Sequence, residues 1–581
     1  MSECAMEDAV SALPPQTGSF PMTITDPITV ALTGELSFIL IVSGCLGLLI
    51  SFLLLWLYRR AVQRGMARRT GTPATPEASG AARMTSAPPS APLAITYADT
   101  GRKKSAVNGD LDLYRRALTG PWRAAAVYGA GGALFAAVLA FAFLWSSGIE
   151  LRPLRFLMLF WIYAWPLVLT LWLVAATTRR EKLLLATAYV TGYGILTLAA
   201  IITSPDASVS QVVGLWIITN LAPTLLFLVF LLRRVRAVGP LVVTLLVCAI
   251  TGASLLLDVL EWNQNVLRTV SSFFFSLGLG GRETFVALIV LGLGFFAVIG
   301  WFVLQWLRRG YQAKWLNDQS LILDALWLLF GISYAIELAF EGAAWVAAGL
   351  VAFAVYLTTV RLGFRLLTTD RALKGSSLLV LRVFSLGKRS ETLFDAVSRH
   401  WRYVGTVQLI AGPDLTAATV EPHEFLDFVS GRLERQFIDN PEALDRRLGT
   451  LDARPDFDDR FRINDFFCHD DTWQTTLAAL VQHSDAVLMD LREFTPNRQG
   501  CIYEIRQLLQ HMPLARIVML ADATTDGEFL EQTVVAAWDA LPIGAPNRAV
   551  PKPHLTVIQG HREADRNLHA LLAAICRAAT T

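Results

Sequence analysis

The sequence predicts a two-part protein: an α-helical membrane domain of about nine spans, followed by a C-terminal α/β domain with a mostly parallel sheet. Hydrophobic residues make up 54% of the 581 residues and charged residues only 17%, whereas an ordinary soluble domain has about 25% charged residues. The charges lie in short connections between long apolar runs and become frequent after Arg365. We therefore expect most of the chain before that residue to lie in a lipid bilayer.

Charge and cysteine content exclude several classes of protein. The net charge of +2 gives no overall positive field, so nucleic acid is not expected as a partner. The six cysteines are scattered without a C-x-x-C pair, which argues against a zinc site or a disulfide framework. They are Cys4, Cys45, Cys248, Cys468, Cys501 and Cys576.

Nine apolar segments are long enough to cross a membrane, which needs about 20 apolar residues of helix. They lie near residues 36–57, 124–146, 154–177, 183–203, 211–232, 238–259, 284–307, 320–340 and 343–362. The first segment, 36–57, is too long for the core of a signal peptide, so we interpret it as an uncleaved anchor after an extracytoplasmic tail of residues 1–35. The other eight form a helical domain over residues 122–363.

Basic residues alternate between the connections, and this alternation predicts the orientation. Positively charged connections stay in the cytoplasm. The odd-numbered connections carry Arg59, Arg60, Arg64, Arg68, Arg69, Arg179, Arg180, Lys182, Arg233, Arg234, Arg236, Arg308, Arg309 and Lys314. The even-numbered ones carry only Arg152, Arg155, Arg268 and Arg282. We expect a multi-pass protein of the cell (inner) membrane, with its N-terminus outside and its C-terminal domain in the cytoplasm.

Two connections have a distinctive composition. Residues 58–121 contain a Pro/Ala/Ser/Thr-rich stretch and a basic GRKK at 101–104, which predicts a disordered cytoplasmic linker. Its basic residues act either as a topology signal and spacer or as a contact for anionic lipid headgroups. The stretch 261–283 is too short and too rich in Gly and Ser to span, so it predicts a helix lying in the membrane interface.

Ionisable residues within the spans raise the alternative of a transporter or channel with a cytoplasmic regulatory domain, because buried charges in lipid are costly and usually functional. Asp324 and Glu337 lie in the eighth span, but about 20 Å apart along the helix, so they do not form one site. Asn220 and Pro223 indicate either a polar kink or ordinary helix packing.

The C-terminal domain, residues 364–581, alternates short β-branched runs with amphipathic segments, which is typical of an α/β fold. The predicted strands are 378–385, 406–411, 486–491, 516–522 and 554–559. The predicted helices are 390–403, 422–437, 471–483, 499–511, 526–540 and 562–578. Because the strands are apolar nearly throughout, we expect a parallel sheet that is covered on both faces.

Ligands of such sheets bind at the carboxyl ends of the strands, so the polar residues there are the candidate site. Arg382 and Ser385 end the first predicted strand, and Asp490 and Arg492 follow the third. Asp490 and Arg492 form either a loop salt bridge or contacts with a ribose or phosphate. Glu504 lies near the start of the next helix, where a carboxylate points towards the crevice or simply stabilises the helix end.

The run TTLAALVQHSDAVLMDLREFTPNRQGCIYEIRQLL, residues 475–509, resembles the central part of a TIR (Toll/interleukin-1 receptor) domain. In that family a helix ends in Ser, a hydrophobic strand follows, and the next helix carries Cys-x-x-Glu, matched here by Cys501 and Glu504. The run is also similar to nucleoside 2-deoxyribosyltransferases, through Asp490, Gly500 and Glu504. The resemblance implies a flavodoxin/TIR-like sheet.

Both families cleave N-glycosidic bonds, with the glutamate as the key carboxylate. The resemblance therefore implies that Glu504 is catalytic, that NAD or a related nucleotide-type molecule is the substrate, and that the domain associates with itself. A positioned carboxylate stabilises the oxocarbenium-like state of such a reaction.

An insertion of some 60 residues separates the second predicted strand from the helix at 471. Its end, residues 461–473, contains Cys468, His469, Asp470 and Asp471. Adjacent residues rarely converge on one ion, so no metal is expected, and Asp470 or Asp471 is interpreted as the N-cap of the next helix. The segment 432–448 alternates charges at helical spacing, which predicts a solvated helical face.

These observations leave three hypotheses. The first is a membrane-anchored signalling or defence-type protein whose TIR-like domain binds NAD or a related nucleoside and hydrolyses it. The second is a non-catalytic membrane sensor or scaffold that uses the α/β domain for protein assembly. The third is the transporter or channel.

Overall fold

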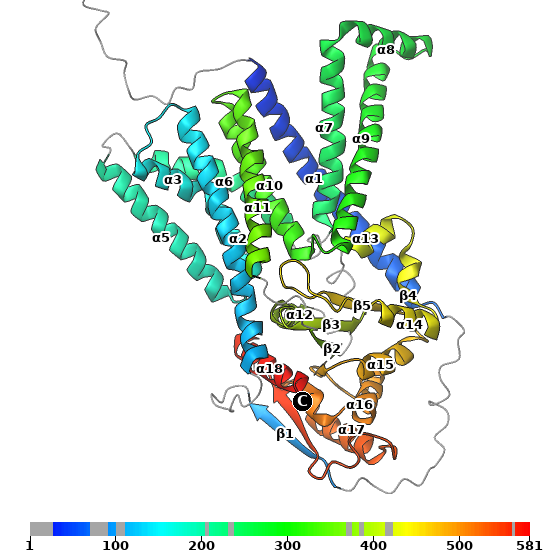
Figure 1. Ribbon diagram of the computed structural model, residues 1–581. Coiled ribbons are helices and arrows are strands. Elements are labelled where there is room, and N and C mark those ends of the chain that lie inside the picture. The colour runs from blue at the N-terminus through cyan, green and yellow to red at the C-terminus, as the bar shows by residue number, and fades with distance from the viewer. Residues whose placement is uncertain are drawn as a thin grey trace, which may run out of the picture.

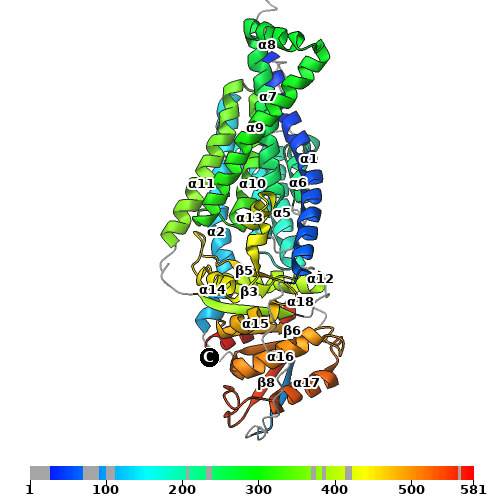
Figure 2. The same cartoon turned by 90° about the vertical axis from the view of Figure 1, so that its right-hand side faces the viewer.

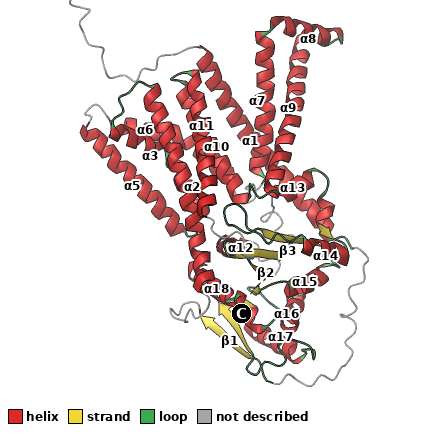
Figure 3. Cartoon of the chain, viewed as in Figure 1, coloured by secondary structure: helices red, strands yellow, loops and turns green. Residues whose placement is uncertain are grey.

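The computed structural model describes residues 27–69, 91–99, 111–203, 208–230, 238–367, 375–382, 388–412, 422–560 and 564–581. Figure 1 shows a bundle of long helices with a sheet domain at one of its ends. The view turned by 90° shows the same arrangement, with the helix α8 at the opposite end of the bundle (Figure 2). The strands belong to the sheet domain (Figure 3).

The bundle contains the apolar helices that the sequence predicts. They are α1 (Pro27–Met66), α2 (Leu111–Ser146), α3 (Pro153–Tyr163), α4 (Trp165–Val174), α5 (Arg179–Thr203), α6 (Val209–Phe230), α7 (Gly239–Trp262), α9 (Gly281–Gln312), α10 (Asp318–Ala339) and α11 (Ala347–Leu367). Among the described residues, eight helices are long and apolar enough to cross a membrane, and α3 with α4 makes a ninth if this bent pair is one span. Each of the nine predicted segments overlaps one of these helices or this pair.

The bent pair is held by a buried polar contact. α3 and α4 meet at Ala164 with a bend of 42°. Asn220 of α6, which is fully buried, donates a hydrogen bond of 3.3 Å from its amide to the carbonyl of Ile162, just before the bend. Tyr334 of α10 donates in turn to the amide oxygen of Asn220 at 2.7 Å. Asn220 thus helps to satisfy backbone that lies next to the break, as helix breaks in membranes require.

The stretch 261–283, for which the sequence predicts a helix, contains α8 (Gln264–Ser276), which joins the tips of α7 and α9 (Figure 1). Asn263 begins it, and its side chain accepts a hydrogen bond from the backbone N–H of Val266. Phe273 and Phe275 are exposed, so α8 presents apolar side chains at the end of the bundle far from the sheet domain. A helix of this kind lies readily at a membrane surface.

Every strand pairing in the sheet is parallel. The strands are β1 (Ala94–Asp99), β2 (Ser376–Arg382), β3 (Gly405–Ile410), β4 (Phe437–Ile438), β5 (Ile463–Cys468), β6 (Ala486–Asp490), β7 (Ile517–Ala521) and β8 (His554–Gln559). Their order is β1-β8-β7-β6-β2-β3-β5-β4. The five predicted strands are confirmed as β2, β3, β6, β7 and β8.

Helices cover both faces of the sheet, as a parallel sheet requires. They are α12 (Lys388–Trp401), α13 (Pro422–Val429), α14 (Pro441–Gly449), α15 (Trp473–Gln482), α16 (Gln499–His511), α17 (Gly527–Asp539) and α18 (Ala564–Ala579), with the short 3-10 turns η3 (Leu433–Gln436) and η4 (Leu514–Arg516). A further 3-10 turn, η2 (Ala343–Val346), belongs to the bundle and lies between α10 and α11. On β2, Leu379 packs in the core formed with α15, α16 and α17, whereas Leu378 packs in the core formed with α12, α18 and the start of α2. Successive strand residues therefore bury themselves on opposite faces.

The expectation that residues 58–121 form one disordered linker is wrong, because both ends of this segment are helical and part of its middle is a strand. α1 continues to Met66, α2 already begins at Leu111, and residues 94–99 form β1 at the edge of the sheet. β1 pairs with β8 along its whole length, from Ala94 beside His554 to Asp99 beside Gln559. The indole of Trp538 on α17 donates a hydrogen bond of 3.1 Å to the carbonyl of Ala91, which holds the segment just before β1. The GRKK at 101–104 lies outside the described residues.

The 60-residue insertion adds the strands β5 and β4 to the sheet beyond β3, with the helix α14 between them in the chain. The sequence did not predict these two strands. The predicted helix 422–437 is shorter, ending as α13 at Val429, and 432–448 becomes η3, β4 and α14 rather than one helical face. Thr472, not Asp470 or Asp471, precedes α15, and it makes no side-chain cap. Thr472 instead accepts a hydrogen bond from the backbone N–H of His469 at 2.9 Å.

The insertion docks the sheet domain onto the bundle. Arg402, beside the insertion, makes a two-pronged ion pair with Asp318 at the start of α10, with N–O distances of 2.8 and 2.9 Å. The amide of Asn317 donates to Asp458 at 2.7 Å. Arg308 of α9 pairs with Asp427 of α13 at 2.7 Å. These charged groups are largely buried, so the contact is specific rather than a loose surface encounter.

The end of α1 is held in the same way. The imidazole Nδ1 of His469 lies 2.6 Å from the carbonyl oxygen of Gly65, and its Nε2 lies 2.6 Å from a carboxylate oxygen of Asp439. The backbone N–H of Asp470 donates to the carbonyl of Met66. Among the described residues, no group of three His, Cys, Asp or Glu side chains could hold a metal ion. Within this cluster His469 anchors a helix.

Three of the four basic connections touch the sheet domain. Arg68, after α1, pairs with Glu434. The carbonyl of Ala176, in the connection before Arg179, accepts a hydrogen bond from Arg399 of α12. Lys314, after α9, pairs with Asp452. The connection with Arg233, Arg234 and Arg236 lies outside the described residues. The basic connections described here therefore lie at the sheet-domain end of the bundle.

Candidate functional site

The chain changes direction in the sheet between β2 and β6. From β2 it proceeds to β3 on one side, and it later returns to β6 on the other side of β2 before continuing to β7 and β8. Counted from β2, the strands β3-β2-β6-β7-β8 have the order 2-1-3-4-5, one of the common doubly wound orders. In such sheets the crevice at the carboxyl ends of the two strands at the switch point is the usual ligand site.

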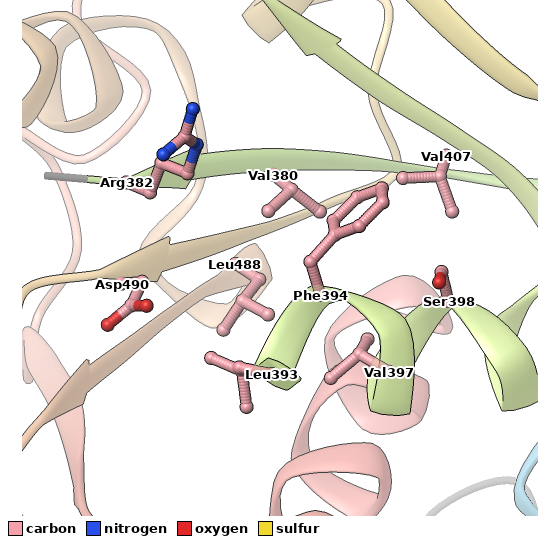
Figure 4. A pocket seen from close by; sticks show the side chains of 9 residues that line it. All are labelled: Val380, Arg382, Leu393, Phe394, Val397, Ser398, Val407, Leu488 and Asp490. Carbon is pink, nitrogen blue, oxygen red and sulfur yellow. The ribbon is translucent and has the colours of Figure 1, made fainter. Parts of the chain in front are cut away.

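The structure places the candidate residues Arg382 and Asp490 at this point. Arg382 ends β2, Asp490 ends β6, and the two are direct neighbours in the register of the sheet. Both side chains are buried, at 5% and 2% exposure. Figure 4 shows that they leave the strand ends in different directions. Both residues lie at strand ends, as the sequence predicts, and the strand order puts these two ends side by side.

Asp490 forms the predicted loop salt bridge with Arg492. The Nε and Nη2 atoms of Arg492 donate to the two carboxylate oxygens at 2.8 and 2.6 Å. Such a two-pronged pair holds both side chains in one orientation. These hydrogen bonds, with the nearby carboxylates, raise the pKa of Arg492 although its burial acts in the opposite direction. In this state Asp490 therefore has a structural role, because both of its carboxylate oxygens are bonded to Arg492.

A second ion pair extends the site to β7. Asp522 directly follows β7 and accepts a hydrogen bond of 2.6 Å from Arg389 of α12. It also accepts one from the backbone N–H of Thr524, and these contacts lower its pKa against the effect of burial. The backbone carbonyl of Arg389 accepts a hydrogen bond from Arg492. Arg389 and Asp522 were not predicted from the sequence, although Asp522, like Asp490, is an aspartate at the carboxyl end of a buried strand.

Glu504 lies one turn and a half into α16 and is the most unusual group of the site. It is 3% exposed, and its Oε2 atom finds no hydrogen-bond partner among the described residues. Burial raises its pKa to about 8, with the positive charge of Arg382 acting in the opposite direction. A buried polar atom without a partner costs free energy, so it requires an explanation. A helix-end or solvated glutamate would instead be exposed.

Cys501 lies one turn before Glu504 on α16 and faces the end of β2. Its thiol is buried and lies 4.0 Å from the backbone carbonyl of Arg382. Burial and the neighbouring Glu504 raise the pKa of the thiol, so Cys501 remains a neutral thiol rather than a nucleophilic thiolate. Of the two ionisable side chains Cys501 and Glu504, Glu504 is thus the one suited to exchange a proton or to carry a charge in a reaction.

A small cavity opens beside the switch point, on the face of the sheet covered by α12. Its walls are Val380, Arg382, Leu393, Phe394, Val397, Ser398, Val407, Leu488 and Asp490 (Figure 4). The cavity measures only about 10 Å³ and is mostly apolar, so it holds one water molecule at most. Glu504 is not among its lining residues. In this state Arg382 borders the cavity and acts electrostatically on Glu504.

The remaining candidate, Ser385, lies outside the described residues. The structure thus brings together Arg382, Asp490, Arg492 and Glu504 at the carboxyl ends of β2 and β6. No family model matches the sequence, and comparison with curated proteins and with solved structures also gives no match. What the fold and the site define is therefore a class: a bundle of apolar helices docked to a doubly wound parallel sheet with a buried carboxyl group at its switch point.

Proposed function

We propose that this protein is a membrane-anchored signalling protein whose TIR-like sheet domain binds NAD, or a related cationic nucleoside, at the switch point and cleaves its N-glycosidic bond. The observation that carries the proposal is Glu504, a buried carboxyl group whose Oε2 lacks a hydrogen-bond partner among the described residues, near Arg382. The order 2-1-3-4-5 of the five strands β3-β2-β6-β7-β8 is the one expected of a flavodoxin/TIR-like sheet, whereas β1, β4 and β5 extend the sheet at its two edges. The basic connections favour a cytoplasmic position for the domain, where NAD is available.

The positive charge of the substrate explains how Glu504, which is neutral in the empty site, can act as a carboxylate during the reaction. With a pKa of about 8, Glu504 is protonated at neutral pH when the site is empty. A positively charged nicotinamide ring beside it favours the carboxylate, because an opposite charge stabilises the ionised form. The resulting negative charge then stabilises the oxocarbenium-like ribose as the bond breaks.

The bond that breaks joins C1′ of the ribose to the ring nitrogen of nicotinamide. Its electron pair leaves with the nitrogen, so nicotinamide departs as a neutral molecule and the ribose carries the positive charge. Water adds to C1′ and loses a proton to solvent, which gives ADP-ribose. The role of Glu504 is electrostatic and requires only that its carboxylate lies against the ribose.

Binding requires the site to open. The cavity of about 10 Å³ is far smaller than a nucleoside needs, since ligand pockets measure roughly 300–1,000 Å³. Arg382 borders that cavity and is the charged group whose field reaches Glu504. Segments that open and close over a site on a rigid sheet are common in enzymes. We therefore infer that the described state is the closed, inactive one.

The proposal is tested by incubating the full-length chain, reconstituted in nanodiscs at high protein density, with NAD and measuring nicotinamide by mass spectrometry. Wild type should release nicotinamide and ADP-ribose in equal amounts. Glu504→Gln, which has nearly the same shape, should reduce release at least 100-fold. Glu528→Gln, an exposed glutamate on α17, is the matched control and should behave as wild type. Absence of release by wild type, or equal release by Glu504→Gln, contradicts catalysis.

The docked interface favours a second candidate, a non-catalytic sensor or scaffold. Arg402 and Asp318 join the sheet domain to α10 by a largely buried ion pair, so movement of that helix reaches the sheet directly. In this case Glu504→Gln leaves cellular signalling intact, whereas Asp318→Asn abolishes it. The two candidates make opposite predictions for the same pair of variants.

A further inference from the structure

A second, larger cavity lies between the bundle and the sheet domain, at the other end of β2 from the switch point. Gly375 and Ser376, where β2 begins, form part of its wall. A seven-residue strand is roughly 20 Å long, so this cavity is remote from Glu504. It measures about 390 Å³. Its walls come from α2, α11 and the loop before β5.

The positive charge of the cavity comes from α2. Arg116 and Arg123 both line it and are both exposed. They are seven residues apart, which is two helical turns, so they lie on one face of α2 about 10 Å apart. Arg123 donates a weak hydrogen bond of 3.4 Å to the carbonyl of Leu367 at the end of α11, which holds its guanidinium over the cavity.

The acidic residues of the cavity are already engaged. Asp458 is fully buried and accepts hydrogen bonds from Asn317 at 2.7 Å and from the hydroxyl of Tyr128 at 3.4 Å. Asp459 also has an interaction partner. Two further arginines, Arg361 and Arg365, line an open cavity on the neighbouring face of α11. The balance of available charge at this end of the two helices is therefore positive.

The cavity also lies where the surface of the bundle changes from polar to apolar. Trp122, which is 47% exposed, stands next to Arg123, and the exposed residues further along α2 are apolar, such as Leu134 and Phe141. Tryptophan and arginine at the end of an apolar stretch mark the level of the lipid headgroups. Ala124, Val127 and Phe364 give the cavity an apolar wall on the bilayer side.

We propose that this cavity binds the phosphate headgroup of an anionic phospholipid, with Arg116 and Arg123 as the phosphate ligands and the acyl chains along α2 and α11. Arginine forms paired hydrogen bonds with phosphate oxygens. Basic pockets between membrane helices on the cytoplasmic side are suited to such headgroups. The site is independent of the chemistry proposed for Glu504, and it places a lipid at the junction between the bundle and the sheet domain.

The test uses native mass spectrometry of the full-length chain released from nanodiscs of phosphatidylcholine with or without phosphatidylglycerol. Wild type should retain phosphatidylglycerol in preference to phosphatidylcholine. The double variant Arg116→Gln, Arg123→Gln should bind it at least tenfold more weakly. Arg116→Lys, Arg123→Lys keeps the charge but loses the paired hydrogen bonds, so it should bind the lipid more weakly than wild type and more tightly than the Gln double variant. The matched control is Arg115→Gln, an exposed neighbour on α2 that does not line the cavity.

A further arm separates the lipid from a soluble phosphate compound. Inorganic phosphate and glycerophosphoglycerol should not displace the lipid at millimolar concentration, because they lack the acyl chains. Displacement by either compound, equal retention of both lipids, or equal loss in the Arg115→Gln control would overturn the proposal. Hydrogen exchange of β2 and β3 in each variant verifies that the sheet domain remains folded and docked.

Discussion

Replacing Glu504 by Gln should change the stability of the sheet domain in a pH-dependent way. The pKa of Glu504 is raised from 4.5 to about 8, so the folded state holds a proton that the unfolded state has released between these pH values. Wild type therefore loses stability as the pH rises through this window. At about 1.4 kcal/mol per pH unit, the loss approaches at most about 5 kcal/mol above pH 8. Gln cannot ionise and should not show this loss.

Hydrogen-exchange mass spectrometry of the full-length chain measures the effect locally, on peptides from α16. At each pH the protection of residues 499–511 in Glu504→Gln is compared with wild type, so the intrinsic pH dependence of exchange cancels. The two should be similar near pH 5, and the variant should be at least tenfold better protected at pH 8. The exposed Glu528→Gln should show no such trend. A variant less protected at every pH would mean that Glu504 is an ionised, paired carboxylate.

Two further predictions concern the architecture. Residues 375–581 expressed alone should aggregate, because removal of β1 leaves β8 as an open edge; a fusion that restores residues 91–99 should stay monomeric in gel filtration, and a monomeric fragment without them would contradict the role of β1. Asp318→Asn leaves Arg402 and Arg460 without their shared carboxylate at the docking interface and should cost about 3–5 kcal/mol. It should raise protease cleavage between the bundle and the sheet domain, whereas Glu341→Gln at the other end of α10 should not.

The strands β6 and β7 are the clearest of those that the sequence predicted correctly. Both are buried at every position, and an uninterrupted apolar run in the sequence indicates each of them. β1 has the alternating pattern Ile95, Thr96, Tyr97 but follows a proline-rich stretch, and only its distant partner β8 makes it a strand. β5 contains Asn464 and Asp465, which are unfavourable in strands. Pairing across the sheet overrode the local composition in both cases.

The site was predictable in position but not in environment. Strand ends and the start of a helix placed Arg382, Asp490 and Glu504 together from the sequence alone. The absence of a hydrogen-bond partner for Oε2 of Glu504, and the closed state of the cavity, depend on how α12 and α16 pack against the sheet. The docking interface could not be predicted from the sequence either, because its ion pair joins Arg402 to Asp318, which are 84 residues apart in the chain.

The most direct test of Glu504 as the carboxylate of a nucleoside site is calorimetric binding of a carbocyclic NAD analogue, which keeps the cationic nicotinamide but resists cleavage. Full-length protein in nanodiscs is titrated at pH 7 in buffers of different ionisation enthalpy. Wild type should bind the analogue and release close to one proton, because the cation favours the Glu504 carboxylate. Glu504→Gln should bind without releasing a proton. No binding by wild type, or the same proton release in both proteins, would contradict the account.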